Sequence, residues 1–459
     1  MTTRALAEFV AGLRYEDLPE AVVAQACDII LDAVGCAVSA WVEDAEKARI
    51  ARDIAALYPA PSGGAGVIGV RGPKGGGGAQ AAFAALANGI LINAADNDDT
   101  HKRALLHVGS VEVPVALGLG QAHRLSGRDV ILALVAGYEV AVRVGMAVMP
   151  THYRFWHSTA TNGTFGAAAA AAKALGLDAD RVQMALGLAG TQAAGLNTFF
   201  ESGDMTKSFH PGKAALNGIL SAQLATLGHT SPPGILEHPK GYLAAFSLEP
   251  KPEALVAGLG TTWEILQNGI KFFPSILASH SPIQATLAIV NRVAIDPAQI
   301  ASITNETYNT VKSHFSNKNV TGVMSARVSV PYCIAVAAVD RVLTQAQFAP
   351  ARVNDALVRQ VLARTEVIPD AALDKLYPEN FPARVTIRMR DGTTHQETVM
   401  KPKGDPGNPL SPEEIAEKFR GNSVGMLGVA QTEALLMAVR GLPRSPDLGA
   451  LSDLLAPVG

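Results

Sequence analysis

Residues 79–95 read AQAAFAALANGILINAA, an apolar, alanine-rich stretch without proline that is longer than a typical strand. Such a run predicts a helix that is buried against other helices. Breakers such as Gly72-Pro73 and Ser231 to Gly234 separate this stretch from others like it. The similar segments before about residue 265 are 20–40, 129–148, 163–175 and 213–227. The first part of the chain is therefore predicted to be all-helical.

The pattern changes after about Trp263. Residues 300–308 are β-prone, and residues 384–390 alternate apolar and polar side chains. Asp391-Gly392 and a second β-prone run over residues 393–399 follow, which together predict a hairpin. These features indicate a smaller α+β unit over residues 266–403.

A linker at residues 401–409 is followed by Ser411-Pro412-Glu413-Glu414, a capping-box pattern that begins a new helix. The C-terminal helices most simply rejoin the first domain. We therefore predict a mainly α protein with a large all-helical domain of residues 1–265 and 404–459. The smaller α+β domain, residues 266–403, is inserted into it as a lid.

Length and composition restrict the possible partners. A chain of 459 residues is too long for one ordinary core, so two domains are expected.

The formal net charge is −3 and no block of Lys and Arg occurs, which argues against nucleic acid and membrane surfaces as partners. Three scattered cysteines without a CxxC pair favour a reducing compartment. With no signal peptide and no uninterrupted apolar run of about 18 residues, we expect a cytoplasmic protein without a membrane span.

The first candidate site is the turn Asp96-Asn97-Asp98-Asp99-Thr100-His101 (residues 96–101, the Asp turn), which is followed by His107. Three carboxylates in four positions repel one another. One interpretation is a helix cap with a solvated acidic turn. The other is an active site in which one Asp orients a catalytic imidazole and Thr100 binds a ligand.

Three further segments carry histidine or lysine in apolar surroundings. His157 precedes a Gly- and Ala-rich helix, and is either a core histidine or part of an anion site. Lys207-x-x-His210 is either plain surface or a buried cation that holds a carboxylate. Lys271-x-x-Pro274 with His280 is either a linker or the lining of a cleft at the domain junction.

Together these segments supply several cations and imidazoles, but few acids outside the Asp turn. That inventory suits a small polycarboxylate substrate and general acid–base chemistry without a cofactor. The chain has no GxGxxG, Walker A, HExxH or GxSxG motif. The Asp turn could bind a divalent ion but lacks EF-hand spacing, so we predict no metal. A metal-dependent hydrolase is the alternative from another class, and a non-catalytic helical scaffold is a third.

At these residues the sequence resembles the MmgE/PrpD family, which includes 2-methylcitrate dehydratases, cis-aconitate decarboxylases and iminodisuccinate epimerase. The resemblance spans essentially the whole chain. It implies a helical domain built from both chain ends, an inserted α+β lid, a cleft between them, a homodimer and no cofactor. It also implies the active-site positions of the decarboxylase branch, which are Asp96, Thr100, His107, His157, Lys207 and Lys271.

One position departs from the pattern. Mammalian-type decarboxylases carry a histidine two places after the proline of the Lys-x-x-Pro motif, and this chain has Ile276 there, with His280 the nearest histidine. Fungal-type decarboxylases and many bacterial members look more like this sequence. Because Ile276 stands where the mammalian-type decarboxylases have histidine, we favour epimerisation, as of iminodisuccinate, or dehydration of a di- or tricarboxylate. Decarboxylation of a cis-aconitate-like acid is the alternative.

The predicted roles follow from this reading. His107, oriented by Asp96, is the expected general base. His157 is the expected acid, with Lys207 as its competitor. The substrate-binding candidates are Thr100, Asp99, Lys271, His210 and His280.

Overall fold

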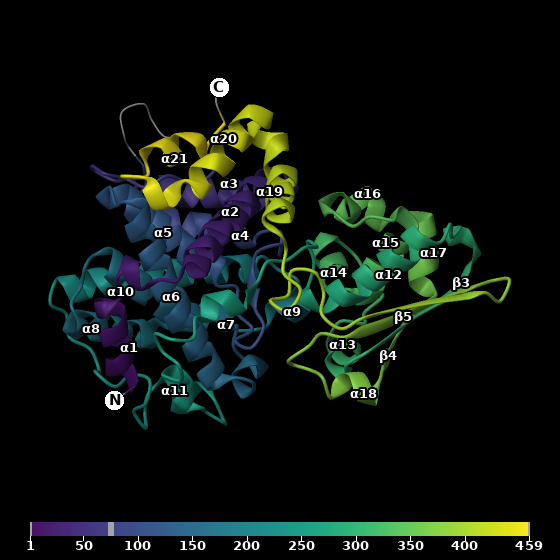
Figure 1. Cartoon of the computed structure of the whole chain (residues 1–459), viewed down its shortest axis with the longest axis horizontal. Helices are drawn as coiled ribbons and strands as arrows, with labels where there is room; N and C mark the ends of the chain where they lie inside the picture. Colours follow the sequence, from purple (N-terminus) through teal and green to yellow (C-terminus); the bar gives the residue numbers. More distant parts are fainter. Residues whose placement is uncertain (1, 72–77, 458–459) are drawn as a thin grey trace. The chain divides into compact units, whose positions relative to one another are not determined.

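The computed structural model describes residues 2–71 and 78–457, so the break expected at Gly72-Pro73 lies outside the described residues. The chain divides into two compact units. The first comprises Met1–Ile270 and Ser411–Gly459, and the second comprises Lys271–Leu410. With 60% helix and 8% strand, the protein is mainly α, which confirms the predicted fold class (Figure 1).

Five helices form the centre of the first unit: α4 (Ala81–Asn93), α5 (Gly109–His123), α6 (Gly127–Val148), α7 (Ser158–Ala174) and α10 (Thr206–Thr226). They pack directly on one another, with α7 against α6 and α10, and α10 against α4. Small residues allow this close approach: a Cβ on Gly89 of α4 would lie 2.6 Å from the Cα of Gly212 of α10. Around them lie α1 (Thr2–Gly12), α2 (Glu20–Glu43), α3 (Ala45–Ala56), α8 (Ala179–Gln192), α9 (Phe199–Ser202) and α11 (Tyr242–Phe246), with 3-10 turns at Tyr15–Asp17, Thr151–Arg154, Pro252–Leu255 and Glu264–Gln267.

The C-terminal segment completes the first unit. Helix α19 (Pro412–Leu427) packs along α2, as the yellow and purple ribbons of Figure 1 show, and α20 (Val429–Arg440) and α21 (Gly449–Leu454) follow it. A 3-10 turn at Leu442–Arg444 joins the last two helices. The predicted capping box begins α19, because the Glu414 N–H donates to the Ser411 hydroxyl at 3.2 Å and the Ser411 N–H donates to the Glu414 carboxylate at 2.7 Å.

Two helices of the first unit, α2 and α6, are long and apolar enough to span a membrane by length and composition alone. The sequence prediction missed them because acidic and basic residues, such as Asp32 in α2 and Arg143 in α6, interrupt their apolar runs. Within their most apolar windows, 72% of α2 and 94% of α6 is buried inside the protein. Core helices of globular domains have this same character, so the finding is weak evidence for a membrane span.

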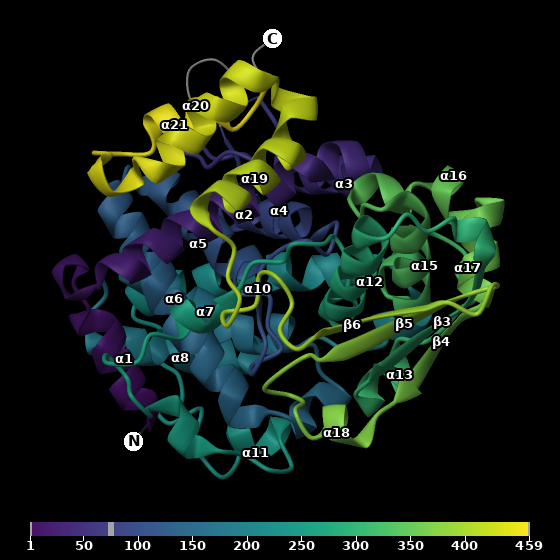
Figure 2. The same ribbon diagram turned by 45° about the vertical axis from the view of Figure 1, so that its right-hand side comes forward.

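The second unit contains a four-stranded sheet in the order β4-β3-β5-β6. Strand β3 (Ile300–Thr307) pairs parallel with β4 (Thr365–Pro369) and antiparallel with β5 (Ala383–Met389), which continues through the predicted Asp391-Gly392 turn into β6 (Thr394–Val399). Helices α12 (His280–Arg292), α15 (Val330–Asp340) and α17 (Ala356–Ala363) contact the sheet (Figure 2). The remaining helices are α13 (Asn309–His314), α14 (Val323–Arg327), α16 (Pro350–Val353) and α18 (Ala371–Asp374), with 3-10 turns at Leu277–Ser279, Pro297–Gln299 and Gln345–Phe348.

Both unit boundaries lie a few residues beyond the predicted ones, for identifiable reasons. Strand β2 (Asn268–Gly269) pairs with β1 (Thr100–His101), so the chain stays in the first unit up to Ile270. The linker stays with the second unit, where the Lys403 N–H donates to the Gln284 side chain at 2.8 Å.

Helix α10 also begins earlier than predicted, at Thr206 rather than 213, and passes through Pro211. A proline so close to the start of a helix removes only one intrahelical hydrogen bond. Lys207 and His210 are therefore fixed in the first turns of α10.

Candidate active site

The Asp turn follows the C-terminal end of α4 and is buried. Asp96, Asp98 and Asp99 are each at most 2% exposed, so the interpretation as a solvated acidic cap is wrong. The backbone adopts positive φ at Asp96 (53°) and at Leu105 (48°), which is strained for leucine in particular. Strain of this kind persists only where surrounding contacts impose it, and buried carboxylates are costly unless they are paired. The partners of each carboxylate therefore decide its role.

Asp99 connects secondary-structure elements. Its carboxylate accepts hydrogen bonds from the Tyr138 hydroxyl at 2.7 Å, the Asn268 amide at 2.7 Å and the Gly109 backbone N–H at 3.0 Å. Burial, reinforced by the neighbouring Asp98, raises the pKa of Asp99 to about 7. The substrate-binding role predicted for Asp99 is therefore corrected. Three groups of the protein itself already donate hydrogen bonds to its carboxylate, which lies at the N-terminus of α5.

His107 is held through its Nδ1 atom. That nitrogen lies 3.0 Å from the backbone carbonyl oxygen of Asp99 and 3.2 Å from the Thr100 hydroxyl. Asp98 Oδ2 lies 3.5 Å from the same nitrogen, and the Asn93 amide donates to both Asp98 oxygens at 3.0 and 2.9 Å. Because a carbonyl oxygen only accepts, Nδ1 carries the proton. In the neutral ring, Nε2 is then the basic nitrogen.

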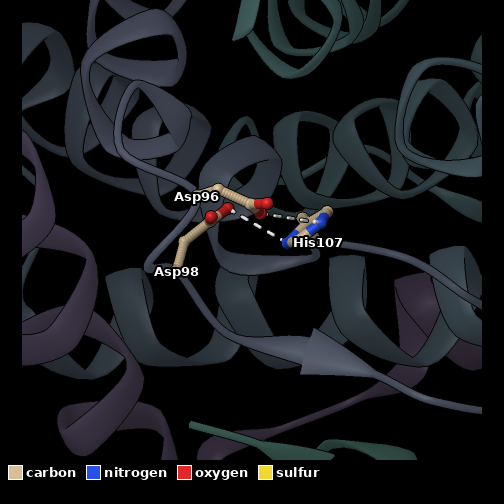
Figure 3. A group of neighbouring side chains, drawn as sticks. All are labelled: Asp96, Asp98 and His107. Atoms are coloured by element: carbon tan, nitrogen blue, oxygen red, sulfur yellow. Dashed lines mark ion pairs between the residues drawn. The ribbon is translucent and has the colours of Figure 1, made fainter. Parts of the chain in front are cut away.

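Asp96 pairs with a lysine rather than orienting the imidazole. Its Oδ1 lies 2.6 Å from Lys207 Nζ but 3.8 Å from His107 Nε2, beyond hydrogen-bond distance. Figure 3 shows the carboxyl groups of Asp96 and Asp98 next to each other, both facing the His107 ring. The contacts that orient the ring, which were predicted to come from Asp96, instead come from the Asp99 carbonyl and the Thr100 hydroxyl, with Asp98 facing the same nitrogen. Asp96 instead fixes the ammonium of Lys207.

His157 and His210 form a buried pair. His157 is the N-cap residue of α7, its backbone N–H donates to the Gly195 carbonyl at 3.0 Å, and its Nδ1 lies 2.9 Å from His210 Nδ1. Burial, and then the positive potential of His210 and Lys207, hold the pKa of His157 well below its usual range. Burial also lowers the pKa of His210, to about 4. Both rings are therefore neutral at pH 7, which disfavours His157 as a cationic acid and leaves Lys207 as the stronger candidate.

Two side chains of this cluster retain exposed surface. The side chains of His107 and Lys207 are 12% and 11% exposed, whereas Asp96 and Asp98 are at most 3% exposed. The two carboxylates are therefore more deeply buried than the imidazole-bearing and ammonium-bearing side chains. His210 contacts the His157 ring, so we assign it to positioning that ring rather than to binding substrate.

Lys271 and His280 belong to the second unit, and their site roles stay predictions. Lys271 is the first residue of that unit, and His280 begins α12. His280 Nε2 lies 3.3 Å from the Ser275 carbonyl oxygen, and its ring packs edge-on against Phe273. Among the residues predicted for the site, the first unit brings together Asp96, Thr100, His107, His157, Lys207 and His210.

Asp96, Asp98 and His107 offer ligand atoms that all lie within 4.8 Å of one another, which is close enough to hold a metal ion. Their contacts fit this role poorly, however. Lys207 already places a positive charge on Asp96, and the Asn93 amide donates to both oxygens of Asp98. A cation bound here would have to displace both donors, so the contacts favour acid–base chemistry over a metal centre.

The sequence did not predict the residues that hydrogen-bond to the Asp turn and to His107. Asn93 could have been noticed, because it is an amide in an apolar helix five residues before Asp98. Thr159, whose hydroxyl accepts from the His107 N–H at 3.2 Å, and Tyr138 gave no comparable signal. Their partners lie 52 and 39 residues away in sequence, and only the packing of α5, α6 and α7 brings them together.

Comparisons with known proteins agree with this picture. The family model of the MmgE/PrpD N-terminal domain matches residues 4–255, and that of the MmgE/PrpD C-terminal domain matches residues 273–442. The chain is 32% identical to a cis-aconitate decarboxylase of Aspergillus terreus, over 99% of this chain and 95% of the relative. It is 31% identical to the mouse cis-aconitate decarboxylase (81% of this chain, 78% of the relative) and 27% identical to the human one (99% and 94%). Since the two family models together cover most of its length, this chain belongs to the MmgE/PrpD family.

Proposed function

We propose that this protein is an acid–base enzyme that moves a proton at a carbon next to a carboxylate of a small di- or tricarboxylic acid, using side chains alone. One observation carries the proposal. The ammonium of Lys207 and the basic nitrogen of His107 converge on one oxygen of Asp96, at 2.6 and 3.8 Å. A proton donor and a proton acceptor therefore both lie within 4 Å of one carboxylate oxygen, and both side chains retain some exposed surface.

The surroundings of the pair suit an anionic substrate. Lys207 offers a charge that can pair with a carboxylate. Helix α7 begins at His157, and Lys207 acts electrostatically on that residue, so the positive end of the helix dipole adds to the positive potential here. Negative charge that develops on a substrate carboxylate during proton transfer would be stabilised at the same place.

The roles follow from the protonation of each group. His107, with its proton on Nδ1, accepts or returns a proton at Nε2. Lys207 either donates a proton to the substrate or pairs with the substrate carboxylate on which negative charge develops. Lys271 is proposed as a second carboxylate-binding lysine on the basis of the family resemblance alone, and Thr100 helps to fix the His107 ring through its hydroxyl.

We propose decarboxylation of a cis-aconitate-like acid as the first reaction to test, since the relatives compared above carry that name. In this reaction the bond to the departing carboxylate breaks and carbon dioxide leaves. The electron pair delocalises onto the remaining unsaturated carboxylate, and one proton from the enzyme quenches the carbanion.

Epimerisation or dehydration is the second candidate, favoured by the absence at Ile276 of the histidine that mammalian-type decarboxylases carry. Both reactions begin when His107 removes the proton next to a carboxylate. Return of a proton to the opposite face gives the epimer. Loss of a protonated hydroxyl from the adjacent carbon gives the alkene and water.

A single experiment separates these reactions. The protein is incubated in D2O with cis-aconitate, citrate, methylcitrate and iminodisuccinate in turn, and proton NMR spectra are recorded over time. A decarboxylase gives a new alkene that has lost carbon dioxide and carries deuterium. A dehydratase gives an alkene that keeps all its carbon atoms, and an epimerase washes deuterium into the α-position without forming an alkene. If no compound reacts or exchanges, and His107→Gln behaves like the wild type, the proposed function is rejected. The homodimer implied by the family resemblance is tested separately by light scattering.

A further inference from the structure

A buried lysine from the C-terminal segment contacts the Asp turn from behind. The Lys418 side chain, on α19, is 8% exposed. Its Nζ donates to the backbone carbonyl oxygen of Asn97 at 2.7 Å and lies 2.5 Å from Asp32 Oδ1 on α2. Asp32 is itself 1% exposed at its side chain, so this ion pair is enclosed by protein.

Asn97 has a particular place in the site. It lies between Asp96, which pairs with Lys207, and Asp98, which faces His107. Its carbonyl belongs to the peptide that joins Asn97 to Asp98, one residue after Asp96, where φ is 53°. Holding this oxygen restrains the orientation of that peptide, and therefore limits the directions in which the two flanking carboxylates leave the backbone.

We propose that Lys418 is a positioning residue of the active site: its ammonium holds the Asn97 carbonyl so that Asp96 and Asp98 meet Lys207 and His107. This inference rests on the proposed function, because it assigns Lys418 a part in the same reaction. The ion pair with Asp32 is the means by which the lysine remains charged and in place. Burial is the largest effect and opposes the charge on Lys418, but the neighbouring acidic groups, with Asp32 foremost, together outweigh it and raise the lysine pKa above its usual value.

The competing explanation is that Lys418 and Asp32 form only a structural ion pair. Three variants separate the two explanations. Lys418→Met removes the contact with Asn97 and leaves Asp32 buried without its partner. Asp32→Asn keeps the lysine and its contact with Asn97. The double variant Asp32→Asn/Lys418→Met removes that contact but leaves no unpaired charge.

We expect kcat for the substrate found in the NMR experiment to fall about 10- to 100-fold in both variants that lack Lys418, because small misplacements of reacting groups have effects of this size. KM should stay within about twofold, since Lys418 lies behind the turn and the effect is one of geometry. Asp32→Asn should retain more of the wild-type kcat than either variant that lacks Lys418, because its lysine can still donate to the Asn97 carbonyl. The melting temperature should fall in Lys418→Met and recover in the double variant.

Recovery of kcat together with the melting temperature in the double variant would overturn the proposal, because a structural ion pair alone predicts that result. Equal kcat in the double variant and in Asp32→Asn would overturn it as well. Glu417 is the exposed residue before Lys418 on the same helix. Glu417→Gln is therefore the control for the effect of any substitution in α19.

A second readout is independent of turnover, so that failure of the proposed function can be told apart from failure of this inference. The protein is labelled with carbon-13 at the Cε1 atoms of histidine, and the His107 resonance is assigned by its loss in His107→Gln. Removing Lys418 in the Asp32→Asn background should displace the His107 resonance, because the carboxylate facing its Nδ1 moves. An unchanged resonance would refute the positioning role whatever the substrate is.

Discussion

Glu112 provides a test of the packing beneath the candidate site. It lies on α5, is fully buried, and neither of its carboxyl oxygens has a hydrogen-bond partner among the described residues. Glycines of the neighbouring helices make room for it: a Cβ on Gly137 would lie 2.5 Å from Oε2, and one on Gly166 would lie 2.3 Å from Oε1. Burial therefore raises the pKa of Glu112 well above 4.5, its usual value.

The sign of the effect on stability follows from this shift. Below pH 4.5 the carboxyl is protonated in both the folded and the unfolded chain. Above it, the unfolded chain releases the proton while the folded protein keeps it, so the free energy of unfolding falls by about 1.4 kcal/mol per pH unit until the folded-state pKa is reached. A carboxyl still protonated at pH 7 thus lowers the stability by roughly 3 kcal/mol relative to pH 4.5. Glutamine has nearly the same shape and never ionises.

We therefore expect Glu112→Gln to be more stable than the wild type at pH 7, with a difference that shrinks towards pH 4.5 at about 1.4 kcal/mol per unit. Urea unfolding followed by circular dichroism at several pH values between 5 and 8 measures this difference. The exposed Glu417→Gln is the matched control, and its difference from the wild type should not depend on pH in this way. A constant difference between Glu112→Gln and the wild type would show that Glu112 is ionised in the folded protein and would refute the reasoning.

Three further predictions concern the site and its support. His107→Gln should lower kcat by about 10²- to 10⁴-fold while circular dichroism stays unchanged, because a general base is removed from a partly exposed position; activity near that of the wild type would reject its role. Lys207→Met should abolish turnover and lower the melting temperature, since Asp96 is left buried without its cation, and adding Asp96→Asn should restore the melting temperature but not turnover. Gly89→Ala should destabilise the protein by about 1–3 kcal/mol in urea unfolding, since the new Cβ meets α10 at 2.6 Å, whereas Gly421→Ala, with nothing within 4 Å, should not.

The fold was largely predictable because its signals are local. Three sequence patterns each determine structure only within a few neighbouring residues. They are the apolar run that forms α4, the Asp391-Gly392 turn between β5 and β6, and the capping box at Ser411. The start of α10 was misplaced because Pro211 suggests a break, and only the packing against Gly89 shows why the helix continues through it.

The sequence named side chains that the first unit brings together, but it did not indicate how they pair. The sequence indicated that a carboxylate would accompany His107, yet it could not distinguish Asp96 from Asp98, since both lie in the same turn. The choice depends on Lys207, which is 111 residues from Asp96 and reaches its carboxylate only because α10 packs against α4. The pKa of Asp99 depends likewise on burial, and burial is a property of the assembled helices rather than of the turn.

The contact of Lys418 with Asn97 joins residues 321 positions apart, and this separation has a consequence for biosynthesis. The ribosome produces Asp32 and the Asp turn early, then the whole second unit, and α19 only near the end. Until α19 emerges, Asp32 has no cation from this helix, and the turn lacks the hydrogen bond that fixes Asn97. Nascent chains that end before α19 should therefore contain His107 and Lys207 without their final geometry, and we expect them to depend on chaperones more than the finished protein does.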